Sequence, residues 1–198
     1  MNRHSAAALP EDRDGFRFRG GCAALDLPAT LQARLMPSPR ELLATPQDLE
    51  RWLVSAGLAA STPGASEDDL SAARALREAI YTLAGQLGGE SFDGAALDVL
   101  NQVAALPPAA SELSPTGRAE LKGSVAALLS SVAREAIHLF GGKDAARVRQ
   151  CQASGCTIYF IDSSRSGDRR WCSMSACGNK AKVEEFRRRK RERKFEVS

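Results

Sequence analysis

Histidine and long apolar runs are scarce in this chain, and both absences narrow what the protein can do. The 198 residues include two histidines, His4 and His138, and no apolar run approaches the roughly 18 residues that a membrane-spanning helix requires. The first ten residues lack the apolar core of a secretory signal. We therefore expect a cytoplasmic protein without a membrane partner.

Catalytic motifs are also missing. The chain has no phosphate-cradling glycine motif and no nucleophile elbow, and two histidines are too few for a general acid and base set. Cys22 follows Gly20 and Gly21 without an identifiable activating partner, so a buried structural thiol is favoured over a redox sensor. We expect no enzymatic activity.

Four of the five cysteines form two pairs with the same internal spacing. Four residues separate the members of each pair, and fifteen residues lie between the pairs. Two short cysteine loops joined by a hairpin supply the four convergent ligands of a tetrahedral zinc site, and no histidine lies inside this stretch. Disulfides fit poorly because the cysteine count is odd and no export signal is present, while buried thiols remain an alternative for one or two of them. The predicted Zn²⁺ ligands are Cys151, Cys156, Cys172 and Cys177.

Positive charge is concentrated after this cysteine stretch. Residues 1–146 hold 13 Lys and Arg against 18 Asp and Glu, a balance of −5, whereas residues 147–198 hold 14 against 6, a balance of +8. Residues 179–194 have a helical composition and include the basic run 187–194. A cationic helix gains affinity for polyanions by releasing counterions, so we expect nucleic-acid binding rather than a merely solvated tail.

The region before the cysteines has the periodicity of several amphipathic helices. Thr45 and Ser66 each precede an acidic residue three positions later, which is the pattern of a helix N-cap. On the second helix we expect Arg74, Arg77 and Glu78 on the solvent-exposed face. Phe16–Arg19 alternates like a short strand and stops at a glycine pair. The expected helices cover 45–57, 66–88, 93–106 and 118–140, with a loop over 107–118.

The cysteine stretch resembles a known motif. The segment Tyr159–Asp162, then Arg169–Met174, then Cys177-Gly178-Asn179 is similar to the CGNR-type zinc finger. Lys180 departs from that motif, which has Arg at this position. The lysine ammonium keeps the positive charge but cannot form the bidentate hydrogen bonds of a guanidinium.

The N-terminal region also resembles a family. A Gly-Gly turn followed by Leu25-Asp26-Leu27 is similar to the start of the ABATE domain, although Pro28-Ala29-Thr30 stands where relatives usually have an Asn-Thr pair. Proteins that combine this domain with a CGNR finger are proposed to be stress-induced transcription regulators.

This resemblance implies a mainly α, α+β architecture in two parts. Residues 14–142 would form a regulatory or effector domain, and residues 147–194 a small treble-clef-like finger with four cysteines, made of a β-hairpin and a basic helix. The implied function is a zinc-dependent, nucleoid-associated regulator that binds duplex DNA and whose N-terminal domain senses a small-molecule effector or forms a homodimer. The alternative is a zinc-stapled module for RNA or protein partners.

Several residues of the finger have specific expected roles. Asn179 could pair with adenine or cap the final helix, with the cap favoured. Asp162 could bind base amines, but we expect it to order its turn or pair with Arg165 or Arg169. We expect a packed core in which the hairpin residues Ile158, Phe160 and Trp171 meet the helix residues Val183 and Phe186. The candidate nucleic-acid contacts are Arg165, Arg169, Arg170, Asn179, Lys180, Lys182, Arg187, Arg188, Arg189, Lys190 and Arg191.

Overall fold

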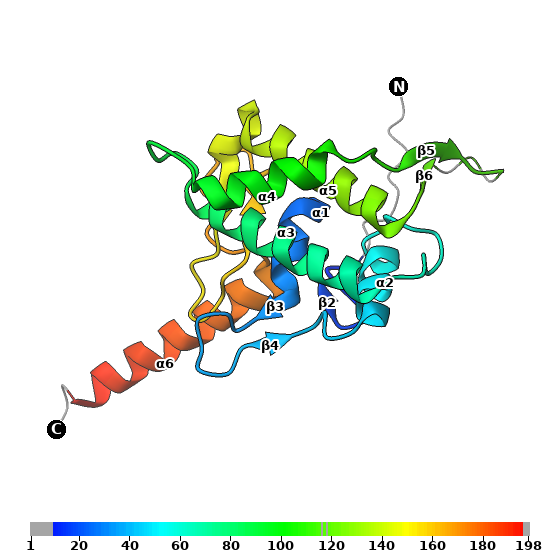
Figure 1. Ribbon diagram of the computed structural model, residues 1–198. Coiled ribbons are helices and arrows are strands. Elements are labelled where there is room, and N and C mark those ends of the chain that lie inside the picture. Colours follow the sequence, from blue (N-terminus) through cyan, green and yellow to red (C-terminus); the bar gives the residue numbers. More distant parts are fainter. Residues whose placement is uncertain (1–9, 116, 118, 196–198) are drawn as a thin grey trace.

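Helices form most of the protein, and they are arranged as a helical body from which one long helix projects (Figure 1). The computed structural model describes residues 10–115, 117 and 119–195, and from residue 191 onward the backbone only. No helix among these described residues is long and apolar enough to cross a membrane. The α-helices are α1 (Ala23–Asp26), α2 (Pro46–Ser55), α3 (Glu67–Gly85), α4 (Gly94–Ala105), α5 (Val125–Phe140) and α6 (Asn179–Phe195).

The strands are short and pair only as antiparallel hairpins in the described part of the chain. Three further helical turns connect the elements: η1 (Leu27–Thr30), η2 (Lys143–Arg147) and η3 (Met174–Gly178). The four hairpins are β1 (Asp12–Arg13) with β2 (Phe16–Arg17), β3 (Leu31–Gln32) with β4 (Arg40–Glu41), β5 (Ala110–Leu113) with β6 (Ala119–Lys122), and β7 (Val148–Gln150) with β8 (Tyr159–Ile161).

The main core lies among α2, α3, α4 and α5, with the short helix α1 buried between them. Ala24 of α1 is fully buried, as are Trp52 of α2 and Ile80 of α3. Trp52 and Ile80 come from the apolar stripes that the sequence predicts, because residues three or four apart share one helix face, whereas α1 was not predicted as a helix. The mainly helical architecture with small β-hairpins is confirmed.

The predicted helix starts are confirmed in atomic detail. The Thr45 side chain accepts from the backbone N–H of Asp48, and the Asp48 carboxylate accepts from the N–H of Thr45. Ser66 and Asp69 form the same reciprocal box at the start of α3. Each box satisfies backbone donors that the first helical turn leaves without partners.

The predicted helix over 118–140 is wrong at its start. Residues 110–113 and 119–122 pair as the strands of the β5–β6 hairpin, and α5 begins only at Val125. Ser124 caps α5 by accepting from the N–H of Ala127. A Cβ on Gly123 would lie 3.0 Å from the Cβ of Ala127, so the chain turns sharply before the cap. β5 lies in the predicted loop over 107–118 and β6 in the predicted helix, because Leu121 also fits the helical stripe.

Arg77 is the second departure from the expected fold, because it is buried rather than exposed. Only 4% of it is accessible, and its guanidinium donates to Glu41 at 2.6 Å and to Glu78 at 2.8 Å. Burial opposes ionisation of Glu41, but the hydrogen bond from Arg77 holds the pKa of that carboxyl below its usual value. This half-buried ion pair links β4 to α3, and removing Glu41 would leave the buried Arg77 guanidinium with one charged partner fewer.

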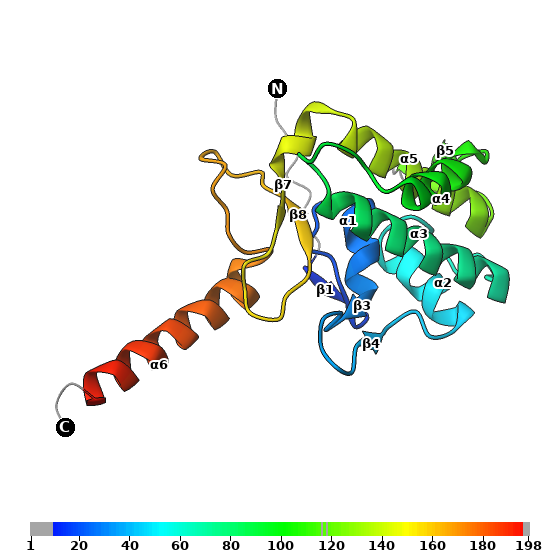
Figure 2. The same cartoon turned by 60° about the vertical axis from the view of Figure 1, so that its left-hand side comes forward.

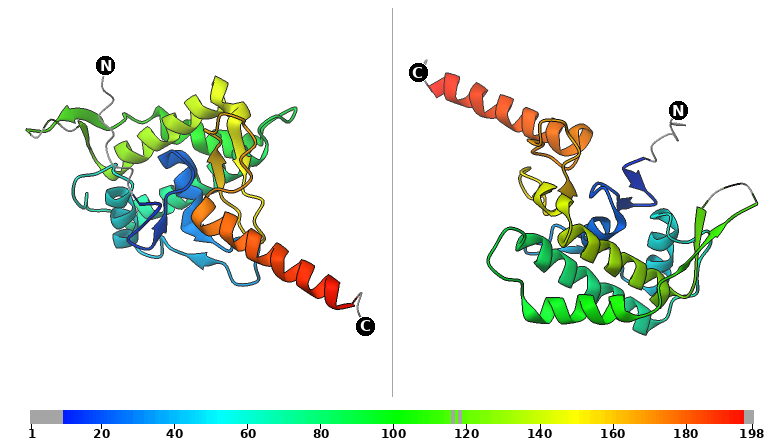
Figure 3. Two further views of the ribbon diagram at one scale, coloured as in Figure 1. Left: turned by 180° about the vertical axis from the view of Figure 1, so that it is seen from behind. Right: turned by 90° about the horizontal axis from the view of Figure 1, so that it is seen from above.

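The C-terminal segment packs on one end of this helical body (Figure 2). Val148, Tyr159 and Ile161 of the β7–β8 hairpin lie against Leu25 of α1, the C-terminal turn of α3 and Leu139 of α5. The backbone N–H of Ile161 also donates to the carbonyl of Gly20 at 2.9 Å. Views from behind and from above show α6 extending from this junction away from the helices (Figure 3).

Replacing Gly20 by Ala should lower the free energy of unfolding by about 1–3 kcal/mol, because the added Cβ overpacks the junction. It would lie 2.6 Å from the Leu25 Cβ and 2.8 Å from the Leu25 carbonyl carbon. Gly94→Ala is the matched control, since a Cβ there meets nothing within 4 Å and α4 is already helical. Urea unfolding of both variants tests the difference, and equal midpoints would contradict the close approach.

Candidate metal centre

The four predicted ligand cysteines converge in the structure. Their sulfur atoms all lie within 4.8 Å of one another, with 3.9 Å between Cys156 and Cys172 and 3.7 Å between Cys172 and Cys177. Zn–S bonds of about 2.3 Å require sulfurs about 3.8 Å apart at the corners of a tetrahedron. All four cysteines are free thiols, since disulfide sulfurs would be about 2.05 Å apart. The donor set therefore fits a structural zinc ion.

Two tight turns hold these sulfurs in place. Cys151 follows β7, and its N–H donates to the carbonyl of Ile158 across the hairpin. The N–H of Cys156 then donates to Ala153, with Gly155 at φ +72° making the turn between them. That left-handed conformation favours glycine, which explains the glycine beside the second ligand.

The second cysteine pair comes from the end of the long loop and from η3. The N–H of Cys172 points at the sulfur of Cys151 at 3.4 Å. Ser173, fully buried, accepts from the N–H of Ala176 and so starts the helical turn that carries Cys177. The N-cap role of Ser173 was not predicted, although a serine just before a helical segment is a typical N-cap.

The sulfurs interact so strongly that a cation is needed to ionise all of them. Hydrogen bonds from the thiols of Cys156 and Cys172 lower the pKa of Cys151. The neighbouring Cys151 sulfur raises the pKa of Cys156 and that of Cys172. Without a cation, one thiolate is therefore favoured while its neighbours keep their protons. A bound divalent ion stabilises four thiolates together and releases those protons.

A small apolar shell covers the sulfur cluster. Phe160 and Cys172 are fully buried, and Ile158 and Ala153 lie beside them. Ala29 of η1, far away in the sequence, belongs to the same cluster. The shell of the metal site is thus partly built from the N-terminal region.

Arg169 points inward rather than toward solvent. Its guanidinium donates to the carbonyl of Trp171 at 2.8 Å and to that of Cys172, and it lies 4.9 Å from the centre of the Phe160 ring. Asp162 is buried and accepts from Ser164 and from the N–H of Arg169. Of the roles considered for Asp162, ordering the turn is the one that the structure has. Arg169 supports the ligand loop, and its side chain is poorly placed for nucleic acid.

The other candidate contacts near the cluster are exposed but partly engaged. Arg170 donates to Gln152 at 2.8 Å and lies over Trp171, and Lys180 donates to the carbonyl of Ser154 at 3.2 Å. The Asn179 amide donates to the Ser175 carbonyl, so the expected cap at Asn179 is wrong and Ser173 has that role. Arg165 and Lys182 are exposed.

The expected packing of α6 on the hairpin is also wrong. Val183 is 47% exposed and Phe186 is 68% exposed, while Phe160 is buried against the sulfurs instead. The helix contacts the finger only near its first turns and then leaves it (Figure 2). Ile158, Phe160 and Ala29 pack around the sulfurs instead of Val183 and Phe186.

The charges of α6 are less uniform than the sequence suggested. Glu185 accepts from Arg188 at 2.9 Å and from Arg189 at 2.7 Å, and these bonds lower the pKa of Glu185 to about 2. It therefore stays ionised at neutral pH and offsets part of their charge. Arg187 and Lys190 are exposed, and the side chain of Arg191 lies outside the described residues.

The fold and the sulfur cluster define a class of protein: a helical domain followed by a small finger with a four-cysteine metal site. Comparison with protein families then identifies both parts. The ABATE model, described as "Putative stress-induced transcription regulator", matches residues 21–143, and the CGNR zinc finger model matches residues 147–190. The chain belongs to the ABATE family and carries a CGNR zinc finger. Neither is an enzyme family, and no curated protein matches the sequence.

Cys172→Ser should reduce zinc affinity by more than the roughly 10–100-fold that loss of a supporting group costs, because it removes a ligand itself. Cys22→Ala is the control, since Cys22 lies outside the sulfur cluster. Elemental analysis of the reduced proteins and competition with a chromophoric chelator measure this. Affinity should also fall as pH falls, because protons compete for the thiolates. Equal zinc content in wild type and Cys172→Ser would contradict the assignment.

Proposed function

We propose that this zinc-binding, regulator-like protein is a transcription regulator that binds duplex DNA through α6 and responds to a small effector through its helical domain. The observation that best supports DNA binding is the placement of α6. It starts at the metal centre and extends clear of the body, with its flanks open to a partner (Figures 1 and 3).

The dimensions and charge of α6 suit a nucleic-acid groove. Its 17 residues span about 26 Å at 1.5 Å each, and the DNA major groove, about 12 Å wide, admits a helix. Residues 179–195 include nine Lys or Arg and three Glu, a net charge of +6. Each phosphate neutralised by such a helix adds affinity through counterion release.

The contacts are best assigned to the distal half of the helix. Arg169 is turned inward, while Arg170 and Lys180 are held against the ligand loop. Beyond Glu185 the basic residues run without interruption to Arg191. Arg187 and Lys190 are therefore the leading phosphate contacts.

One observation favours the alternative partner, single-stranded RNA. Phe186 is 68% exposed and is followed directly by arginines. An exposed aromatic ring beside cationic groups can stack a base, which is how many proteins bind single strands. A duplex partner would leave that ring without a base to stack on.

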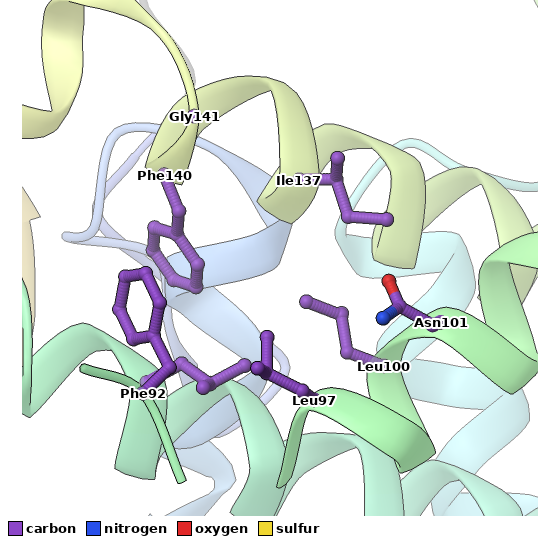
Figure 4. A pocket seen from close by; sticks show the side chains of 8 residues that line it. Phe92, Leu97, Leu100, Asn101, Ile137, Phe140 and Gly141 are labelled. Carbon is purple, nitrogen blue, oxygen red and sulfur yellow. The ribbon is translucent and has the colours of Figure 1, made fainter. Parts of the chain in front are cut away.

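The second half of the proposal rests on an apolar pocket in the helical domain. It has a volume of ≈ 170 Å³, close to the roughly 150 Å³ cavity that accepts benzene in another protein. Figure 4 shows the rings of Phe92 and Phe140 side by side, with the amide of Asn101 on α4 directed toward Ile137 on α5. We assign to it a small, uncharged aromatic effector with one polar group for the amide. The lining residues are Leu83, Phe92, Leu97, Leu100, Asn101, Ile137, Phe140 and Gly141.

Two charge changes on α6 should alter DNA binding in opposite directions. Lys190→Gln should lower the slope of log K against log salt by about 1, because one phosphate contact is lost. Glu185→Gln should raise affinity, because Arg188 and Arg189 lose a shared counter-charge. Lys122→Gln, on β6 at the far end of the molecule from α6, is the control (Figure 1).

Binding by titration at several salt concentrations tests these variants. A preference of at least about 1000-fold for one duplex sequence over random duplex supports regulation of specific genes. Tighter binding to single-stranded RNA than to any duplex, lost in Phe186→Ala, would replace this proposal by the alternative.

The effector pocket can be tested with 4-fluorophenol as a probe. Its ¹⁹F resonance should broaden and shift with the wild-type protein and stay sharp with Ile137→Trp, because the indole fills the pocket. Leu113→Trp is the control, since Leu113 is 77% exposed on the β5–β6 hairpin. An unchanged resonance with wild-type protein at millimolar probe would remove the effector assignment.

A further inference from the structure

We infer that the zinc centre is completed by the N-terminal region, with Arg19 as the positioning cation and the Gly20 turn as the docking point. Zinc binding and docking of the finger on the helical body then form one coupled equilibrium. This coupling does not depend on the identity of the nucleic-acid partner.

The net charge of the zinc–thiolate cluster requires nearby cations. Four thiolates around Zn²⁺ carry a net charge of −2, and burying that charge is costly unless cations lie nearby. A hollow of ≈ 260 Å³ beside the sulfurs is lined by Cys156 and Cys177 of the finger and by Arg17, Arg19 and Lys180. The two arginines come from the N-terminal region, so the helical body supplies positive charge to the metal centre.

Arg19 is the buried member of this group. Its side chain is only 8% exposed, whereas that of Lys180 is 59% exposed. One Arg19 nitrogen donates to Asp12 at 2.6 Å, and its buried Nε, which makes no hydrogen bond in the described structure, lies 3.6 Å from a carboxylate oxygen of Glu11. Burial opposes the charge, yet Asp12 and the nearby Cys172 sulfur hold the pKa of Arg19 above its usual value. Arg19 thus remains a cation facing the cluster.

A continuous series of contacts connects α1 with the apolar shell of the metal site. The buried Asp26 carboxylate accepts from the N–H of Gly20 at 2.7 Å, and the Gly20 carbonyl accepts from Ile161 at 2.9 Å. Ile161 follows Phe160, whose ring covers the sulfurs together with Ala29. A change in the sulfur cluster therefore reaches α1 through a few packed groups.

The β7–β8 hairpin also contacts α3 at a separate place. The ring of Tyr159 meets the edge of Tyr81 at 5.3 Å between centroids. A Cβ on Gly85 would lie 2.9 Å from the Tyr159 hydroxyl oxygen, so the hairpin sits directly on the end of α3. Docking consequently buries apolar surface that only the zinc-folded hairpin presents in this form.

Coupling of this kind is reciprocal. If docking strengthens zinc binding by some factor, zinc strengthens docking by the same factor. Zinc loss should therefore loosen the Gly20 turn and the end of α3, and weakening Arg19 should lower zinc affinity.

The test uses the full chain in three variants. Arg19→Gln should lose at least about 10-fold in zinc affinity by chelator competition, while Arg19→Lys, which keeps the charge, should lose less. Arg40→Gln is the control with an equal charge change, because Arg40 is exposed on β4 and does not line the hollow. Equal affinity of Arg19→Gln and wild type would overturn the electrostatic role of Arg19.

A second measurement uses the wild-type protein alone and so does not require any variant to fold. Amide hydrogen exchange with and without zinc should show faster exchange on zinc removal at Gly20, Ile161 and residues 83–86. Exchange in α2 should stay constant and serves as the internal control. Faster exchange confined to residues 147–195 would show an independent finger and overturn the coupling.

Discussion

The attraction between a divalent cation and four thiolates is the interaction on which the C-terminal quarter of this protein depends. Residues 147–195 contain few large apolar side chains, and most of those that are buried surround the sulfurs. A segment of this size cannot bury enough surface to fold firmly without additional stabilisation. The spacing of the sulfurs, near the edge length of a zinc tetrahedron, explains how such a short segment can direct a rigid helix into solvent.

The same centre also explains why the finger lies against the helical body. A buried cluster with a net charge needs nearby cations and a dry shell. Arg169 supports the loop from within the finger, while Arg19 and Ala29 approach from the N-terminal region. The apolar pocket under α5 lies next to this junction. Leu83 and Phe140 line the pocket, and their chain neighbours Ala84 and Leu139 pack against the finger's hairpin. An effector in the pocket would bear on the surface where the finger docks.

Acidic and basic residues are unevenly distributed along the projecting helix α6. Two of its three glutamates lie in its first half, where Glu185 engages Arg188 and Arg189, and beyond them Arg187 and Lys190 face solvent. The strongest positive potential therefore lies away from the negatively charged metal centre.

The sequence by itself determined the helical periodicity, the capping boxes at Thr45 and Ser66 and the ligand set, because each depends on residues close together in the chain. It could not reveal that Arg77 is buried, that Arg169 turns inward or that Phe186 is exposed, because those outcomes depend on which distant surfaces meet. The β5–β6 hairpin was missed for a related reason: β5 lay in a predicted loop, and the residues of β6 suit a helix until Gly123 and Ser124 are seen to end one element and cap the next. Only the tertiary structure decided that Arg19 and Ala29 reach the metal centre. More than a hundred residues separate them from the sulfurs along the chain, and no local pattern records a contact that packing alone creates.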